Sequence, residues 1–229
     1  GGVDAVEVGL PYSDPLLDGP TIQQAVESAL AAGVSTRDVL RTVTEVASTG
    51  APAVVMSYWN PIERFGVESF AAQLALAGGS GAITADITPD EAGAWITAAR
   101  EHGLDRIFLV APSSTDERVA LTTASTSGFV YAAAVMGVTG ARSEVGEQAA
   151  ALVARTRAAT ELPVCVGLGV STGEQAERVA GFADGVIVGS AFVRQLIDAP
   201  DLAAGVEAVR ELAADLAAGV RRAARSTTA

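Results

Sequence analysis

The sequence predicts an α/β fold, a (β/α)8 TIM barrel, and two observations carry that prediction. Short apolar runs alternate with longer amphipathic runs along all 229 residues, which is typical of parallel strands joined by crossover helices. No Gly-x-Gly-x-x-Gly follows the first apolar run, so an open dinucleotide-binding sheet is disfavoured against a closed barrel. No change of composition divides the chain, and we therefore expect one barrel domain over residues 1–229.

The elements follow from apolar runs and turn residues taken in chain order. The expected strands are Val3–Leu10, Ala53–Tyr58, Gly81–Asp86, Asp105–Val110, Gly128–Ala133, Pro163–Gly167 and Gly185–Gly189. The expected helices are Thr21–Ala32, Thr36–Ser48, Val67–Ala77, Pro89–His102, Asp116–Ser125, Glu144–Thr160, Thr172–Gly181, Phe192–Asp198 and Leu202–Arg225. A closed barrel needs eight strands and the chain opens directly on one, so we expect the N-terminal helix and first strand of the barrel to be missing.

Composition removes several classes of function. The formal net charge is −12, which disfavours a nucleic-acid partner, and no run of about 18 apolar residues predicts a membrane span. All basic residues are arginines, so Schiff-base chemistry on lysine is excluded. With one histidine and one cysteine, a metal site is not expected. We interpret His102 as the C-terminal cap of a surface helix and Cys165 as a core residue, not a nucleophile.

The first strand carries a carboxylate where an apolar residue is the rule. Along residues 3–10, Val6, Val8 and Leu10 share one face, and Glu7 projects from the other between small neighbours. Partial burial would raise its pKa towards neutrality, as an acid–base group requires, although a purely structural glutamate is the alternative. Asp14 is interpreted as a turn residue. Asp18 is either a functional carboxylate beyond the strand end or the N-cap of the next helix.

Glycine turns after the last two strands predict a phosphate site. Gly167 and Gly169 follow one strand, and Gly189-Ser190 lies where the other becomes a helix. Backbone N–H groups and a helix N-terminus at this end of a barrel suit a phosphate, although ordinary tight turns are the alternative. The segment 137–142 is expected to form a lid.

These residues together match one family. The motif EVGLPYSDPLLDGPTIQ, from Glu7 to Gln23, agrees at every fixed position with the signature of the tryptophan synthase α subunit, which the chain resembles along essentially its whole length. The pieces SYWNPIERFG, TADITPDEA, GFVYAAAVMGVTGAR, VGLGVST and VGSA follow in the family's order. The resemblance implies a cytoplasmic lyase that performs the retro-aldol cleavage of indole-3-glycerol phosphate to indole and glyceraldehyde 3-phosphate.

The resemblance also assigns roles to individual residues. The reacting groups are Glu7 as the acid–base residue, Asp18 as acceptor of the indole N–H, and Tyr131 beside the reacting side chain. The phosphate would lie at Gly140, Gly169, Gly189 and Ser190, and the indole at Tyr58, Ile83 and Leu168. Leu168 stands where many members have Phe, which should soften the ring packing.

A partner follows from the same resemblance. We expect a β subunit that carries pyridoxal phosphate, in an α2β2 heterotetramer, and no cofactor in this chain. Family members have about 40 residues before the position of Gly1, so we expect this piece alone to be unstable or inactive. Three alternatives stay open: another phosphate-binding barrel lyase or isomerase, a stand-alone indole-releasing lyase, and a non-catalytic activator of a β subunit.

Overall fold

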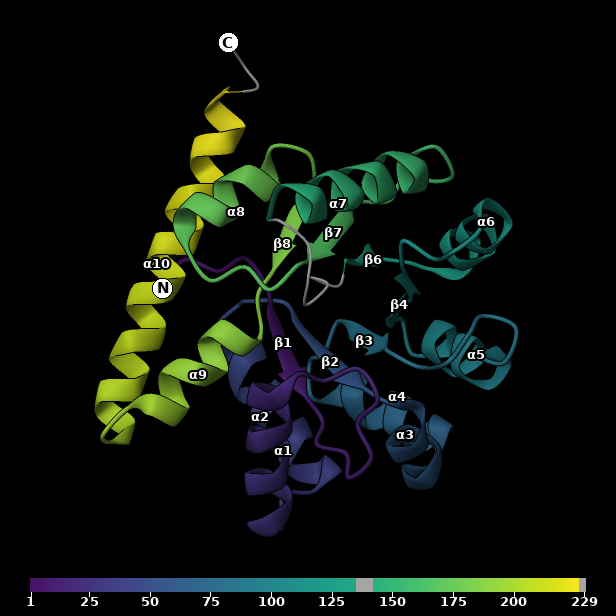
Figure 1. Cartoon of the computed structure of the whole chain (residues 1–229). Helices are drawn as coiled ribbons and strands as arrows, with labels where there is room; N and C mark the ends of the chain where they lie inside the picture. Colours follow the sequence, from purple (N-terminus) through teal and green to yellow (C-terminus); the bar gives the residue numbers. More distant parts are fainter. Residues whose placement is uncertain (135–141, 227–229) are drawn as a thin grey trace. The chain divides into compact units, whose positions relative to one another are not determined.

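The computed structural model describes residues 1–134 and 142–226. Within them the chain forms eight strand segments and ten helices, with the parallel strands and intervening helices that the sequence predicts (Figure 1). Contacts divide the chain into two compact units, of which one holds Asp4–Leu109 and Leu121–Gly128, and the other Gly1–Val3, Val110–Ala120 and Phe129–Ala229. No helix among the described residues is long and apolar enough to cross a membrane.

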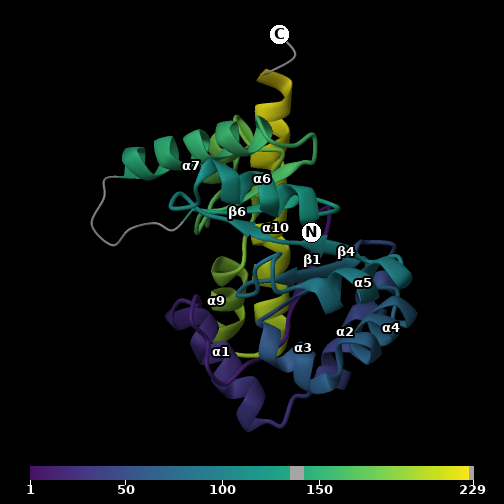
Figure 2. The same ribbon diagram turned by 90° about the vertical axis from the view of Figure 1, so that its right-hand side faces the viewer.

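The first unit is a parallel sheet with helices on one face. Its strands are β1 (Val6–Gly9), β2 (Ala53–Ser57), β3 (Gly81–Thr84) and β4 (Asp105–Ile107), paired in that order. Its helices are α1 (Pro20–Ala31), α2 (Thr36–Ser48), α3 (Trp59–Phe65), α4 (Val67–Leu76) and α5 (Gly93–Glu101). Figure 2 shows α2, α4 and α5 side by side. Alternate strand residues such as Val55 and Ala82 pack with these helices, together with Phe70 and Trp95, in one core.

The second unit repeats this arrangement around its own core. Its sheet contains β5 (Leu109–Val110), β6 (Val130–Ala133), β7 (Val164–Gly167) and β8 (Gly185–Ile187), in that order. Its helices are α7 (Arg142–Arg157), α8 (Gly173–Ala180), α9 (Ser190–Asp198) and α10 (Leu202–Ser226), and α6 (Asp116–Ser125) divides between the units. Helix α10 runs along α8 and α9 (Figure 1). Val166, Leu152 and Leu216 belong to the core under these helices.

The structure departs from the predicted elements at one strand that is divided and at one helix that was not predicted, besides shifts at the ends of other elements. The expected strand Asp105–Val110 is divided at Phe108, whose side chain is buried in the core of the first unit. Helix α3 has no counterpart among the predicted elements. In the structure Pro61 lies in the first turn, where its missing N–H costs no hydrogen bond, and Trp59 N–H donates to Asp86 Oδ1 at 2.6 Å.

Candidate active site

Strand β1 directs Glu7 away from the helices. Parallel pairing places Glu7 beside Val54 of β2, whereas the alternate residues Val8 and Leu10 pack into the helix-covered core. Successive side chains of a strand point to opposite faces, so Glu7 lies on the face that carries no helix in this unit. This confirms the division of faces that the sequence predicts.

The Glu7 carboxyl has the electrostatic character of an acid–base group. Burial and, to a smaller extent, the negative charge of Asp18 together raise its pKa from 4.5 to about 7. Glu7 is exposed to solvent in the structure, and the desolvation imposed by the protein atoms near its carboxyl still disfavours the charged form. At neutral pH both the acid and its conjugate base are therefore populated, which is what two-way proton transfer needs.

Asp18 lies in the loop between β1 and α1. Gly19, not Asp18, occupies the N-cap position of α1, so the alternative interpretation of Asp18 as a helix cap is wrong. Burial raises the pKa of Asp18, and a hydrogen bond from the Tyr58 hydroxyl opposes that rise. Asp14, as expected of a turn residue, is exposed and accepts a 2.6 Å hydrogen bond from Ser13 Oγ.

Tyr58 and Ile83 belong to the same unit as the two carboxylates. Tyr58 is buried at the end of β2, and its hydroxyl accepts a 2.8 Å hydrogen bond from Leu17 N–H in the Asp18 loop. Ile83 is fully buried in β3 and pairs with Met56 of β2. Glu7 pairs with Val54, and Val54 and Met56 point to the same face of β2 because they are two residues apart. Ile83 therefore lies on the same sheet face as Glu7.

Tyr131 occupies the corresponding face in the other unit. It pairs with Cys165 of β7, whereas its neighbours Val130 and Ala132 pack in the helix-covered core. A Cβ atom at Gly167 would lie 2.6 Å from the Tyr131 hydroxyl oxygen, so the absence of a side chain there makes room for the tyrosine. The sequence analysis does not link these two residues; the available signal is the glycine inside a strand, which often marks a place where another group approaches closely.

Cys165 does not belong to the helix-covered core in which the sequence interpretation placed it. It lies on the face of Tyr131, outside the helix-covered core, against Gly185, where an added Cβ would come within 2.6 Å of its Sγ. The period-2 alternation of β7 decides this, because Val164 and Val166 take the core positions. Burial raises the pKa of the thiol to about 11, so it is protonated at neutral pH and unsuited to nucleophilic attack.

The two predicted phosphate turns differ in how their helices begin. At α8 the Thr172 side chain accepts from Gln175 N–H, and Gly173 N–H donates to Asp215 of α10 at 2.6 Å. Protein groups therefore already occupy this N-terminus.

At α9 the N-cap is Gly189, without a side-chain cap, and Ser190 is exposed. The first helical hydrogen bonds run from Phe192 and Val193 to Gly189, which leaves the N–H groups before them for another acceptor. Gly169 has a φ of 68°, which favours glycine, in the loop after β7. Leu168, next to it, is half-buried against the core of this unit. Gly140 and the predicted lid lie outside the described residues, except that α7 begins at Arg142.

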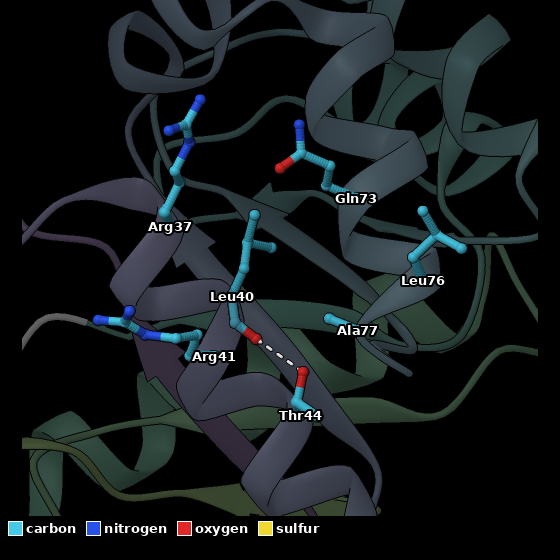
Figure 3. Close-up of a pocket in the computed structure, with 7 residues that line it drawn as sticks. All are labelled: Arg37, Leu40, Arg41, Thr44, Gln73, Leu76 and Ala77. Atoms are coloured by element: carbon cyan, nitrogen blue, oxygen red, sulfur yellow. Dashed lines mark hydrogen bonds between the residues drawn. The ribbon is translucent and has the colours of Figure 1, made fainter.

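The surface groove between α2 and α4 is separate from these residues (Figure 3). It encloses about 440 Å³ and is lined by Arg37, Leu40, Arg41, Thr44, Gln73, Leu76 and Ala77. Arg41 pairs with Asp38 on its own helix, and no carboxylate lines the groove.

His102, as predicted, caps the C-terminus of α5, and its Nε2 lies 2.6 Å from Glu68 Oε1. Within the part of the chain that is described, no cluster of His, Cys, Asp and Glu suits a metal ion.

Parallel strands with intervening helices and a carboxylate of raised pKa within the first strand are typical of α/β enzymes that use carboxylate acid–base chemistry. Residues 1–221 match the tryptophan synthase alpha chain family. The alpha chain of Thermobifida fusca is 61% identical over 98% of this chain and 84% of its own length, and that of Acidothermus cellulolyticus is 64% identical over 97% and 82%.

Solved structures agree with these relatives. Mycobacterium tuberculosis tryptophan synthase matches with a TM-score of 0.87 and 55% identity, over 95% of this chain and 81% of that one. A tryptophan synthase complex from Pyrococcus furiosus matches with a TM-score of 0.82 and 33% identity, over 93% and 85%.

The chain therefore belongs to the tryptophan synthase alpha chain family, and its fold class is the (β/α)8 TIM barrel. It is a lyase of the α reaction of L-tryptophan biosynthesis, which cleaves indole-3-glycerol phosphate to indole and glyceraldehyde 3-phosphate.

Proposed function

We propose that Glu7 and Asp18 perform this cleavage, with Glu7 as the catalytic acid–base residue. The observation that carries the proposal is the Glu7 carboxyl itself, on the helix-free face of β1, with a pKa raised to about 7 beside Asp18. A carboxyl poised near neutrality transfers protons in both directions without a large energetic cost.

The reaction adds one proton to the indole ring of the substrate and removes one from its glycerol phosphate chain. Glu7 donates a proton to indole C3 and accepts the proton of the hydroxyl on the adjacent carbon. The carbon–carbon bond breaks as that carbon becomes the aldehyde of glyceraldehyde 3-phosphate, and the bonding electrons return to the ring. Asp18 accepts a hydrogen bond from the indole N–H and stabilises the positive charge that develops on the protonated ring.

The remaining residues bind the rest of the substrate. Ser190 and the N–H groups at the start of α9 hold the phosphate, together with Gly169 and Gly140. The uncapped N-terminus of α9 supports this role, because the helix dipole favours an anion there. Tyr131 lines the reacting side chain, and Tyr58, Ile83 and Leu168 contact the indole. All of these act within a single domain over residues 1–229.

A β subunit receives the indole. This chain carries no cofactor of its own in the family's α2β2 assembly, and pyridoxal phosphate belongs to the β subunit. The protein is cytoplasmic.

The test is indole release from indole-3-glycerol phosphate by the protein expressed from its natural translation start, with and without a β subunit. We expect indole and glyceraldehyde 3-phosphate in equal amounts, at a rate that the β subunit increases. A folded protein that binds the substrate but releases no indole with either preparation would refute the proposal.

A further inference from the structure

The loop that carries Asp18 has almost no regular structure of its own. Residues 11–19 form no helix or strand, and both Leu16 and Leu17 are exposed. Two of its hydrogen bonds are local, from Ser13 to Asp14 and from Gln23 to the Asp18 backbone oxygen. Neither of them fixes the loop to the sheet.

A single side chain supplies that connection. Within the described residues, the loop residues 11–19 make hydrogen bonds outside their own segment and α1 only to the Tyr58 hydroxyl. The hydroxyl oxygen accepts from Leu17 N–H at 2.8 Å, and the hydroxyl proton is donated to the Asp18 carboxylate. One donor and one acceptor of adjacent loop residues are thus satisfied by the same group.

Tyr58 itself is held rigidly. Its side chain is 5% exposed, and its ring lies 5.4 Å from that of Tyr12, centroid to centroid. The next residue, Trp59, begins α3 and donates its N–H to Asp86 Oδ1 at 2.6 Å, which fixes the backbone on the C-terminal side of Tyr58. A rigidly held hydroxyl that interacts with two successive residues of an irregular loop restricts where the Asp18 carboxylate can lie.

We propose that Tyr58 is a positioning residue for the reaction: its hydroxyl anchors the Asp18 loop to the end of β2 and orients the Asp18 carboxylate towards the indole N–H. This adds to its expected contact with the indole ring, and its catalytic part rests on the proposed role of Asp18. The two roles are separable, because the ring supplies the contact and the hydroxyl supplies the anchor.

The charges around Asp18 give the proposal a pH signature. The groups that act on its carboxyl are Glu7 on β1, which is close enough to interact electrostatically, and Tyr58 after β2. The hydrogen bond from Tyr58 lowers the pKa of Asp18, so its removal should raise that pKa. The acid limb of kcat/KM, which needs ionised Asp18, should then move to higher pH. A role limited to ring packing would leave that limb in place.

The experiment compares wild type, Tyr58→Phe and Ser57→Ala, each with the β subunit. Ser57 is a matched control, because its hydroxyl donates to the Tyr58 backbone oxygen at 2.7 Å and does not touch the loop. In Tyr58→Phe we expect amide exchange at Leu17 to accelerate roughly tenfold, since that N–H loses its acceptor. We also expect kcat to fall roughly tenfold, with KM changed about twofold at most, and the acid limb to move upwards.

Ser57→Ala should show none of the three effects. Unchanged exchange at Leu17 in Tyr58→Phe, or an acid limb that stays at its wild-type pH, would overturn the proposal. If the wild type released no indole, the proposed function would fail, and the Leu17 exchange alone would still decide whether Tyr58 anchors the loop.

Discussion

Substituting Gly167 by alanine tests whether the position of Tyr131 matters for catalysis. The new Cβ would lie 2.6 Å from the Tyr131 hydroxyl oxygen and 2.8 Å from its Cε1. Normal contacts begin at about 3.4 Å, so the ring must move by roughly 0.8 Å. A displacement of about 1 Å at a reacting group can cost on the order of 100-fold in rate. We expect kcat to fall about 10- to 100-fold and the free energy of unfolding to drop by about 1–3 kcal/mol.

The assays are steady-state indole release and urea unfolding. Gly93→Ala is the matched control, because no atom lies within 4 Å of its added Cβ, and both measurements should stay at wild-type values. In a Tyr131→Phe background the nearest clashing atom is gone, so the loss of unfolding free energy caused by Gly167→Ala should shrink. Wild-type kcat in Gly167→Ala, or an equal loss of stability in both backgrounds, would refute the reasoning.

Three further predictions concern charge and packing. Glu7 binds its proton more tightly in the folded state than in the unfolded state, so the free energy of unfolding should fall as pH rises from 4.5 to about 7. Solvent screening limits this fall to about 1 kcal/mol, and the urea midpoint of Glu7→Gln should not show it. Gly219→Ala would place a Cβ against the backbone oxygen of Gly173, so we expect the free energy of unfolding to drop by about 2 kcal/mol or more in calorimetry, and an unchanged melting temperature would contradict the α8–α10 contact. Ser190→Asp adds a negative charge at the start of α9, where it should raise KM for indole-3-glycerol phosphate about tenfold without loss of stability; an unchanged KM would place the phosphate elsewhere.

Periodicity predicted most of the elements because it records which side chains must be buried. Helix α2 has the predicted bounds, Thr36–Ser48, and β1 places Val8 in the core and Glu7 opposite it. The failures occur where a tertiary contact decides. Helix α3 depends on the Asp86 carboxylate, which accepts from Trp59 N–H across 27 residues of sequence. No local pattern contains that information.

The candidate site, too, was predicted from the sequence only in part. The motif around Glu7 predicts which carboxylates react, but it left open whether Asp18 caps a helix, and the position of Gly19 settles that second point. The hydrogen bond from Leu17 to Tyr58 joins residues 41 apart and has no signature in either segment. Likewise, the turns after β7 and β8 both predict a phosphate site, whereas in the structure Thr172 and the Asp215 side chain from α10 occupy the N-terminus of α8 and no side chain caps α9.

The role of Glu7 is tested most directly by indole release from indole-3-glycerol phosphate by Glu7→Gln in the presence of the β subunit. Glutamine keeps the size of the side chain and removes the proton transfer. We predict that kcat falls by about 10³-fold or more, within the range of general acid–base catalysis, while KM changes only a few-fold and the variant stays folded. A folded Glu7→Gln protein that retains kcat within about tenfold of wild type would contradict the assignment of Glu7 as the acid–base residue.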